Sequence, residues 1–98
     1  MFAVINHLHF TKPAATFREP LEREGVPILA GLPGFRSFSF VQTAEDRAVV
    51  VIFWADGESA ANGGRVFGPT WFAANVAPYL ASEQERVLGP ALVHVEAD

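Results

Sequence analysis

The stretch Pro33–Asp56 constrains the fold of this chain more than any other, because it contains two strand patterns joined by a short acidic turn. The first arm alternates between two sets of residues: Arg36, Phe38, Phe40 and Gln42 on one face, and Phe35, Ser37, Ser39 and Val41 on the other. The second arm, Ala48–Ala55, is apolar at every position. A strand that is apolar on both faces must be covered on both faces. The stretch therefore predicts an antiparallel hairpin inside a larger assembly.

Two further strands are expected near the ends of the chain. The first is Phe2–Phe10, in which Asn6 is the one polar residue on an otherwise apolar face. The last is Val87–Glu96, which begins at a sheet edge or a bulge because Gly89-Pro90 lies within it. Between Thr11 and Pro13 the first strand ends, since proline cannot donate a hydrogen bond to a ladder.

Two helical segments are expected between these strands. Pro13–Leu32 has an irregular start, a main helix from about Glu19 and a kink or break near Gly25–Pro27, because proline and glycine disfavour a helix interior. Asp56–Leu80 is helical in two pieces, capped by Asp56 or Ser59. The pieces are separated by glycine- and proline-containing interruptions at Asn62-Gly63-Gly64 and Gly68-Pro69.

The order of elements is therefore β-α-β-β-α-β in one domain that spans residues 1–98. This order predicts an α+β, ferredoxin-like fold, with an antiparallel four-stranded sheet and helices on one face. The other face also carries apolar residues from Phe2–Phe10 and Ala48–Ala55. A homodimer packed sheet to sheet would cover it, and each large side chain would contribute roughly 1–2 kcal/mol on docking.

Composition excludes several classes of partner and site. The net charge is −4 and no basic cluster exists, which argues against nucleic acid and anionic membranes as partners. The absence of cysteine excludes disulfides, thiolate metal sites and cysteine nucleophiles. The longest apolar run, Ala48–Ala55, is too short to span a membrane, and no signal peptide is recognisable. A cytoplasmic protein is expected.

Four motifs carry a resemblance to a known family: VINHLHFTK, LPGFRSF, VVVIFWAD and FGPTWFAANVAPYL. In this order and spacing the chain resembles the dimeric α/β-barrel superfamily, and in particular antibiotic biosynthesis monooxygenases. The resemblance implies a homodimer whose two sheets close into a barrel, with a ligand cleft between the helices and the sheet of each subunit. It also implies activities that range from cofactor-free oxygenation of aromatic polyketides or quinols to haem degradation.

The haem-degrading branch is disfavoured by two positions. Members of that branch have an Asn at the position of Asn6, as here, followed by a Trp beyond the third strand and then a haem-ligating His. The corresponding positions, counted from Trp54, hold Asn62 and Phe72. The chain is therefore expected to use no cofactor and no metal.

Three residues are candidates for catalysis. Asn6 is an amide on an apolar strand face, and it either binds a substrate carbonyl or oxyanion or is a satisfied core residue. His9 shares a strand face with His7 and is a candidate general base, or a polar group near an interface. Tyr79 is the alternative proton acceptor.

Four residues are candidates for substrate binding. Trp71, Phe72 and Asn75 belong to a helical stripe with Tyr79, which either lines a cleft or packs in the core. Asn62 is a possible second amide at the cleft. Trp54 is expected to pack in the core or at an interface.

Two functions follow. The first is a cofactor-independent monooxygenase that acts on an aromatic or quinol-type small molecule. The alternative is a non-catalytic dimeric module, either stress-related or binding a small apolar ligand, because one fold hosts many functions.

Overall fold

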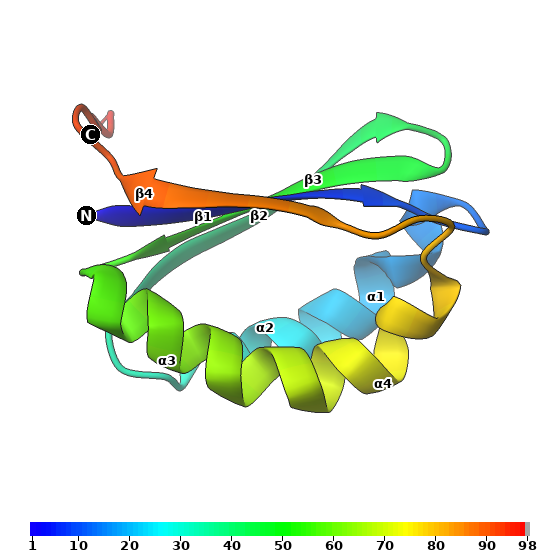
Figure 1. The fold of residues 1–98 in the computed structure, drawn as a ribbon, viewed down its shortest axis with the longest axis horizontal. Helices are drawn as coiled ribbons and strands as arrows, with labels where there is room; N and C mark the ends of the chain where they lie inside the picture. The colour runs from blue at the N-terminus through cyan, green and yellow to red at the C-terminus, as the bar shows by residue number, and fades with distance from the viewer. Residues whose placement is uncertain (98) are drawn as a thin grey trace.

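The sheet has four antiparallel strands in the order β2-β3-β1-β4 (Figure 1). A computed structural model describes residues 1–97. In it the strands are β1 (Phe2–His9), β2 (Phe35–Ala44), β3 (Arg47–Trp54) and β4 (Glu85–Pro90). Two helical runs lie on one face of this sheet (Figure 1). The predicted α+β, ferredoxin-like fold is confirmed.

The first helical run connects β1 to β2 without a break. It consists of a 3-10 turn η1 (Ala14–Phe17), α1 (Arg18–Pro20), a wide π-turn η2 (Leu21–Gly25) and α2 (Val26–Ala30). The expected irregular start is confirmed. At the expected kink or break near Gly25–Pro27 the helix does not break; it widens into the π-turn η2, which ends at Gly25, and Pro27 follows in the first turn of α2.

The second helical run connects β3 to β4. It consists of α3 (Gly57–Phe67), a π-turn η3 (Gly68–Phe72), α4 (Ala73–Asn75) and a 3-10 turn η4 (Ala77–Tyr79). The side chain of Asp56 caps α3, because its Oδ1 accepts a hydrogen bond from the backbone N–H of Ser59 at 2.8 Å. This hydrogen bond, the largest of several causes, lowers the pKa of Asp56 below its ordinary value of 3.8.

The expected interruption at Asn62-Gly63-Gly64 is wrong, because these residues lie inside α3. Gly63 is buried there against Trp54, and a Cβ atom at this position would come within 2.4 Å of the indole ring. The glycine therefore permits close helix–sheet packing rather than ending the helix. The second expected interruption, Gly68-Pro69, coincides with η3, where the helix widens without ending.

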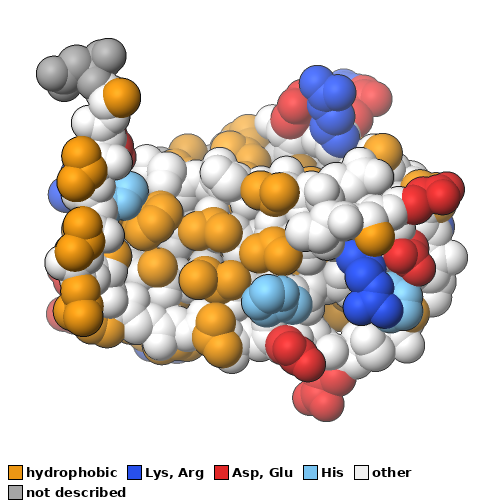
Figure 2. Space-filling model, turned by 90° about the horizontal axis from the view of Figure 1, so that it is seen from above, with side chains coloured by type: hydrophobic (Ala, Val, Ile, Leu, Met, Phe, Trp, Pro, Cys, Tyr) orange, Lys and Arg blue, Asp and Glu red, His pale blue; other side chains and the backbone are white. Residues whose placement is uncertain are grey.

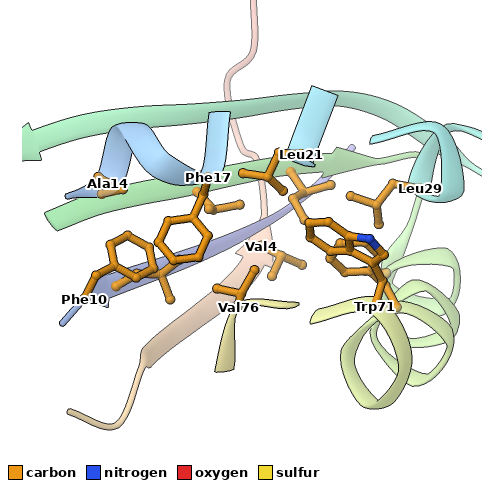
Figure 3. Packing of buried hydrophobic residues seen from close by; sticks show 14 of the residues in the cluster. Val4, Phe10, Ala14, Phe17, Leu21, Leu29, Trp71 and Val76 are labelled. Atoms are coloured by element: carbon orange, nitrogen blue, oxygen red, sulfur yellow. The ribbon is translucent and has the colours of Figure 1, made fainter. Parts of the chain in front are cut away.

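The hydrophobic core fills the space between the sheet and the helices. Its sheet side is formed by alternate residues of β1 and β3: Val4, Leu8, Ala48, Val50, Ile52 and Trp54. Figure 3 shows Phe10, Ala14 and Phe17 gathered at one end of this cluster, and Leu29 and Trp71 at the other. The rings of Phe10 and Phe17 stack with their centroids 4.5 Å apart.

Strand β2 departs from the simple alternation predicted for it. A register shift between Phe35 and Ser37 places Phe35 on the helix-covered face together with Phe38 and Phe40. The ring of Phe35 then meets the ring of Trp54 edge-on, at a centroid distance of 5.8 Å. The prediction that Phe35 and Phe38 point in opposite directions is wrong, because a bulge inserts one residue between them.

Within residues 1–97 no helix covers the other face of the sheet (Figure 1), and Figure 2 views the molecule from that side. Hydrophobic side chains gather across its centre; Ile5, Val49, Val51 and Phe53 are each only partly buried. We call this surface the open face. The register of β1 places His7 and His9 on it as well.

The last strand ends earlier than predicted. β4 stops at Pro90, so the predicted strand Val87–Glu96 is wrong in both its start and its end. Residues 91–97 form no strand and cross one end of the open face, where the rings of His94 and Phe53 lie 4.6 Å apart. Three apolar side chains of this tail are largely exposed: Leu92 (91%), Val93 (85%) and Val95 (86%).

Candidate functional site

A cavity of about 90 Å³ lies between the helix-covered face of the sheet and the two helical runs. Its walls are mostly apolar, and Val4, Phe17, Leu21, Leu29 and Val76, labelled in Figure 3, all line it. Such a space excludes water from its apolar part and suits an apolar or aromatic molecule.

One end of the cavity is polar. Asn6, Gln84 and Arg86 line it there, and the pairing of β1 with β4 sets Asn6 directly opposite Arg86. Residues directly opposite each other in antiparallel strands have Cβ atoms about 5 Å apart and on the same face. Two amides and a guanidinium therefore converge on one end of an apolar space.

The carbonyl oxygens of the two side-chain amides at this end have no hydrogen-bond partner among the described residues. The Oδ1 atom of Asn6 and the Oε1 atom of Gln84 are buried, and neither accepts a hydrogen bond within the described part of the chain. A buried acceptor left without a donor costs about 1–3 kcal/mol. Buried polar groups in proteins nearly always form hydrogen bonds, so both oxygens are expected to accept one from water or from a ligand hydroxyl.

Arg86 supplies a positive charge to the same end. It is exposed on β4, at the margin of the cavity, and among residues 1–97 no carboxylate forms an ion pair with it. Its guanidinium lies along α3 at Gly64, where a Cβ atom would be 3.2 Å from Nη2. The missing side chain of Gly64 thus lets the charge approach the cavity.

Of the seven residues predicted from the sequence to form the site, Asn6 and Phe72 line this cavity. His9 lies on the open face, on the far side of the sheet, where its Nε2 atom is 3.0 Å from Oδ2 of Asp46. Asn6 and His9 are three residues apart on one strand, and side chains of a strand alternate between faces. The structure therefore does not bring these two residues together.

Tyr79 also lies away from the cavity. Its ring packs 5.9 Å from the ring of Phe17, and the ammonium group of Lys12 lies 3.7 Å from the centre of the Tyr79 ring. This cation–π contact occupies the face of the phenol ring.

Trp71 and Asn75 make hydrogen bonds within and between the helical runs. The indole N–H of Trp71 donates a hydrogen bond to Oε1 of Glu24 at 3.2 Å, which joins the two helical runs at their π-turns. The Nδ2 of Asn75 donates to the backbone carbonyl of Trp71 at 2.9 Å. Asn62 is half-buried on α3 and does not line the cavity.

Sequence reasoning missed Gln84 and Arg86. Both residues precede Val87, at which the last strand was expected to begin. The signal that points to them is their spacing: Gln84, Arg86 and Leu88 are alternate residues and so share one face of a strand. This spacing alone does not mark Gln84 and Arg86 as site residues; the pairing of Arg86 with Asn6 does.

The described residues hold no group of three or more His, Asp or Glu side chains placed to bind a metal ion. No helix within residues 1–97 combines the length and apolar character needed to cross a membrane.

No protein-family model and no curated protein sequence matches the chain. Solved structures do match it over almost its whole length. A protein of unknown function from Nitrosomonas europaea, NE2512, superposes with a TM-score of 0.80 at 15% identity, over 99% of this chain and 94% of that one.

Two oxygenases are similar to the chain in the same way. SnoaB, a cofactor-independent oxygenase from Streptomyces nogalater, has a TM-score of 0.78 at 16% identity, over 98% of this chain and 97% of that one. The monooxygenase ActVA-Orf6 of Streptomyces coelicolor, solved with nanaomycin D, has a TM-score of 0.72 at 14% identity, over 99% and 92%. A putative antibiotic biosynthesis monooxygenase from Nitrosomonas europaea also superposes, with a TM-score of 0.77 at 22% identity, over 95% of this chain and 100% of that one. The chain thus has the fold of antibiotic biosynthesis monooxygenases, and the predicted resemblance is confirmed at the level of the fold.

Proposed function

From a fold shared with antibiotic biosynthesis monooxygenases, we propose that this protein is a cofactor-independent monooxygenase that acts on an aromatic or quinol-type small molecule. One observation carries the proposal: Arg86 and the unpartnered amide of Asn6 face each other at the end of an apolar cavity. This arrangement suits an aromatic body with one acidic hydroxyl or enol.

The chemistry follows from the charge. A guanidinium beside a phenol or enol lowers the pKa of that ligand and favours its anion. The anion is rich in electrons and can pass one to O₂, after which the substrate radical and superoxide combine into a peroxide. Loss of water from the peroxide leaves a carbonyl, so one oxygen atom enters the substrate and the other leaves as water.

The ligand loses its proton to solvent at the exposed end of the cavity. Neither histidine of β1 lines the cavity, and Tyr79 does not line it either. Arg86 is exposed, so the proton of a ligand held there can pass to solvent. Asn6 then holds the ligand oxygen, through its amide N–H₂ when that oxygen is an anion and through Oδ1 when it is a hydroxyl.

Oxygen consumption tests the proposal. We expect uptake of O₂ with at least one member of a panel of quinols and anthrones, and a fall of about 10²-fold in kcat for Asn6→Ala, as for the loss of an oxyanion donor. Ser39→Ala, on an exposed part of β2, is the matched control and should keep full activity. Absence of uptake across the panel would contradict the proposal.

A non-catalytic module that binds a small apolar ligand is the second candidate. The observation that favours it is that the described residues lining the cavity include no His, Tyr, Asp or Glu side chain that could act as a general base. Binding of the same compounds without oxygen uptake would select this function over the first.

We also infer that a second copy of the chain covers the open face. Ile5, Val49, Val51 and Phe53 remain partly exposed there, and the tail adds Leu92, Val93 and Val95 beside them. Contiguous apolar surface of this kind is typical of an interface. Sedimentation should give a dimer at micromolar concentration, and a clean monomer would contradict the inference.

A further inference from the structure

The cavity is too small for the ligands proposed above unless it opens. Its volume is about 90 Å³, whereas an engineered protein cavity of about 150 Å³ binds a single benzene molecule. A quinol with fused rings is larger than benzene. A ligand that reaches Arg86 must therefore gain room from a neighbouring space.

A groove of about 440 Å³ lies next to the cavity, between β2 and the first helical run. Ala15, Arg18 and Val26 line its helical side, and Gln42 lines its strand side. Its volume falls within the range of small-molecule sites, about 300–1,000 Å³. The groove therefore provides the room that the cavity lacks.

Three side chains line both spaces: Leu21, Phe38 and Phe40. They form the wall between the cavity and the groove. Leu21 is 6% exposed, at the start of the η2 π-turn, whereas Phe38 and Phe40 are only half-buried and belong to β2, which is an edge strand. Half-buried rings on an edge strand lose less packing when they turn than core residues do.

The sheet register aligns the polar end with this wall. Arg86 pairs with Asn6, Asn6 with Val50, and Val50 with Phe40, so these residues form one straight row across all four strands. Neighbouring strands lie about 4.8 Å apart, so the row is roughly 14 Å long. A molecule that lies along this row contacts Arg86 at one end and passes Phe40 at the other.

We propose that Phe38 and Phe40 form a gate, and that one elongated ligand occupies both the cavity and the groove, with a single acidic group at Arg86 and an apolar body extending past the gate. Charge sets this orientation. Arg86 has no acidic partner within residues 1–97, whereas the cation at the groove, Arg18, is already 3.4 Å from Glu22. The inference rests on the proposed ligand site. It specifies in addition that the ligand is elongated and carries its acidic group at one end.

The test uses a pair of short acids, hexanoate and naphthoate, and a pair of long ones, dodecanoate and pyrenebutyrate, with affinities measured by titration calorimetry below the critical micelle concentrations. We expect affinity to rise about fourfold per added methylene until the groove is filled. Dodecanoate, which is six methylenes longer than hexanoate, should therefore bind more tightly by up to about 10³-fold, and by about tenfold if the groove is filled after only two of them.

Ala15→Trp fills the groove from its outer, exposed side. This variant should weaken the binding of the long acids by about tenfold or more and change the affinity for the short acids by no more than about twofold, because only the long acids must displace its indole ring. Ala30→Trp is the matched control: it is exposed on the same helical run but lines neither space, and all four affinities should stay unchanged.

Phe40→Ala removes half of the gate and should raise the association rate of dodecanoate severalfold in stopped-flow experiments. Far-ultraviolet circular dichroism establishes that each variant is folded.

Equal affinity for short and long acids, or an equal loss of affinity for both in Ala15→Trp, overturns the gate and the groove subsite while the cavity site stands. Failure of all four acids to bind overturns the cavity site together with the inference.

Discussion

The two faces of the sheet are built from the same strands but differ in what covers them. On the helix-covered face, Val4, Ile52 and Trp54 are buried by the protein's own helices (Figure 1). On the open face, Ile5 and Val51 are residues of the same kind, one position away in sequence, yet they stay partly exposed. Figure 2 shows hydrophobic side chains gathered across this face. The difference shows that apolar character alone does not determine which residues of a strand are buried in the core.

The comparison also separates the polar residues of β1 by role. Asn6 faces the cavity together with Arg86, whereas His7 and His9 face outward. One strand therefore presents its amide to the cavity and its two imidazoles to the open face, and variants on the two faces are expected to differ in their effects.

The largest effect is expected from truncating the same residue type on each face. Ile52→Ala removes a side chain that is 7% exposed and should lower the free energy of unfolding by about 2–5 kcal/mol. Ile5→Ala on the open face should cost less in dilute protein, about 1 kcal/mol. Urea titration measures both, and equal losses at every protein concentration would break the comparison.

A second pair tests how tightly α3 packs on the covered face. Gly63→Ala pushes a methyl group against Trp54 and should destabilise the fold by about 1–3 kcal/mol. Gly68→Ala is the control, because nothing lies within 4 Å of a Cβ atom there, and it should stabilise by about 0.4–1 kcal/mol. Thermal unfolding that ranks the two variants in the opposite order would refute the packing described for α3.

A third effect concerns the positive charge at the cavity. Arg86→Leu should weaken the binding of anionic aromatic acids by about tenfold, since a hydrogen bond to a charged group is worth about 1.5–3 kcal/mol. Arg36→Leu serves as the control, because Arg36 is exposed on β2 and does not line the cavity. Unchanged affinity for Arg86→Leu would remove Arg86 from the site.

The smallest effect is expected at the cap of α3. Asp56→Ala should lower the midpoint of thermal unfolding by a few degrees at neutral pH. Because the pKa of Asp56 is lowered in the folded state, its stabilisation is complete above pH 3.8 and is lost as the pH falls through the folded-state pKa. Asp56→Asn keeps the capping oxygen and should lose this pH dependence. A wild-type profile identical to that of Asp56→Asn would show that the cap does not titrate.

Part of this arrangement was predictable from the sequence. The alternation of Phe2–Phe10 placed Asn6 on the apolar face, and the runs of β-branched residues in Ala48–Ala55 located the central strand. These features are local, and packing of alternate residues against the helices reinforces them. The order of the elements then led to the fold.

The rest depends on contacts that a sequence does not contain. The bulge after Phe35 reverses the alternation of its arm, and the pairing that causes it lies on another strand. β4 is held by backbone pairing with β1, while its Val87 and Leu88 are more than half exposed, so its pattern carried little signal. Arg86 became a candidate only when that pairing set it opposite Asn6.

Ligand mapping by NMR tests most directly whether a ligand binds on the helix-covered face of the sheet and not on the open face. Isotope-labelled protein would be titrated with naphthoate while backbone and side-chain amide signals are followed. We expect the shifts to concentrate at Gly64, Gly68 and the side-chain amides of Asn6 and Gln84, with little change at Ile5, His9 and Val51. Shifts centred on His9 and Val51 instead would contradict binding on the helix-covered face.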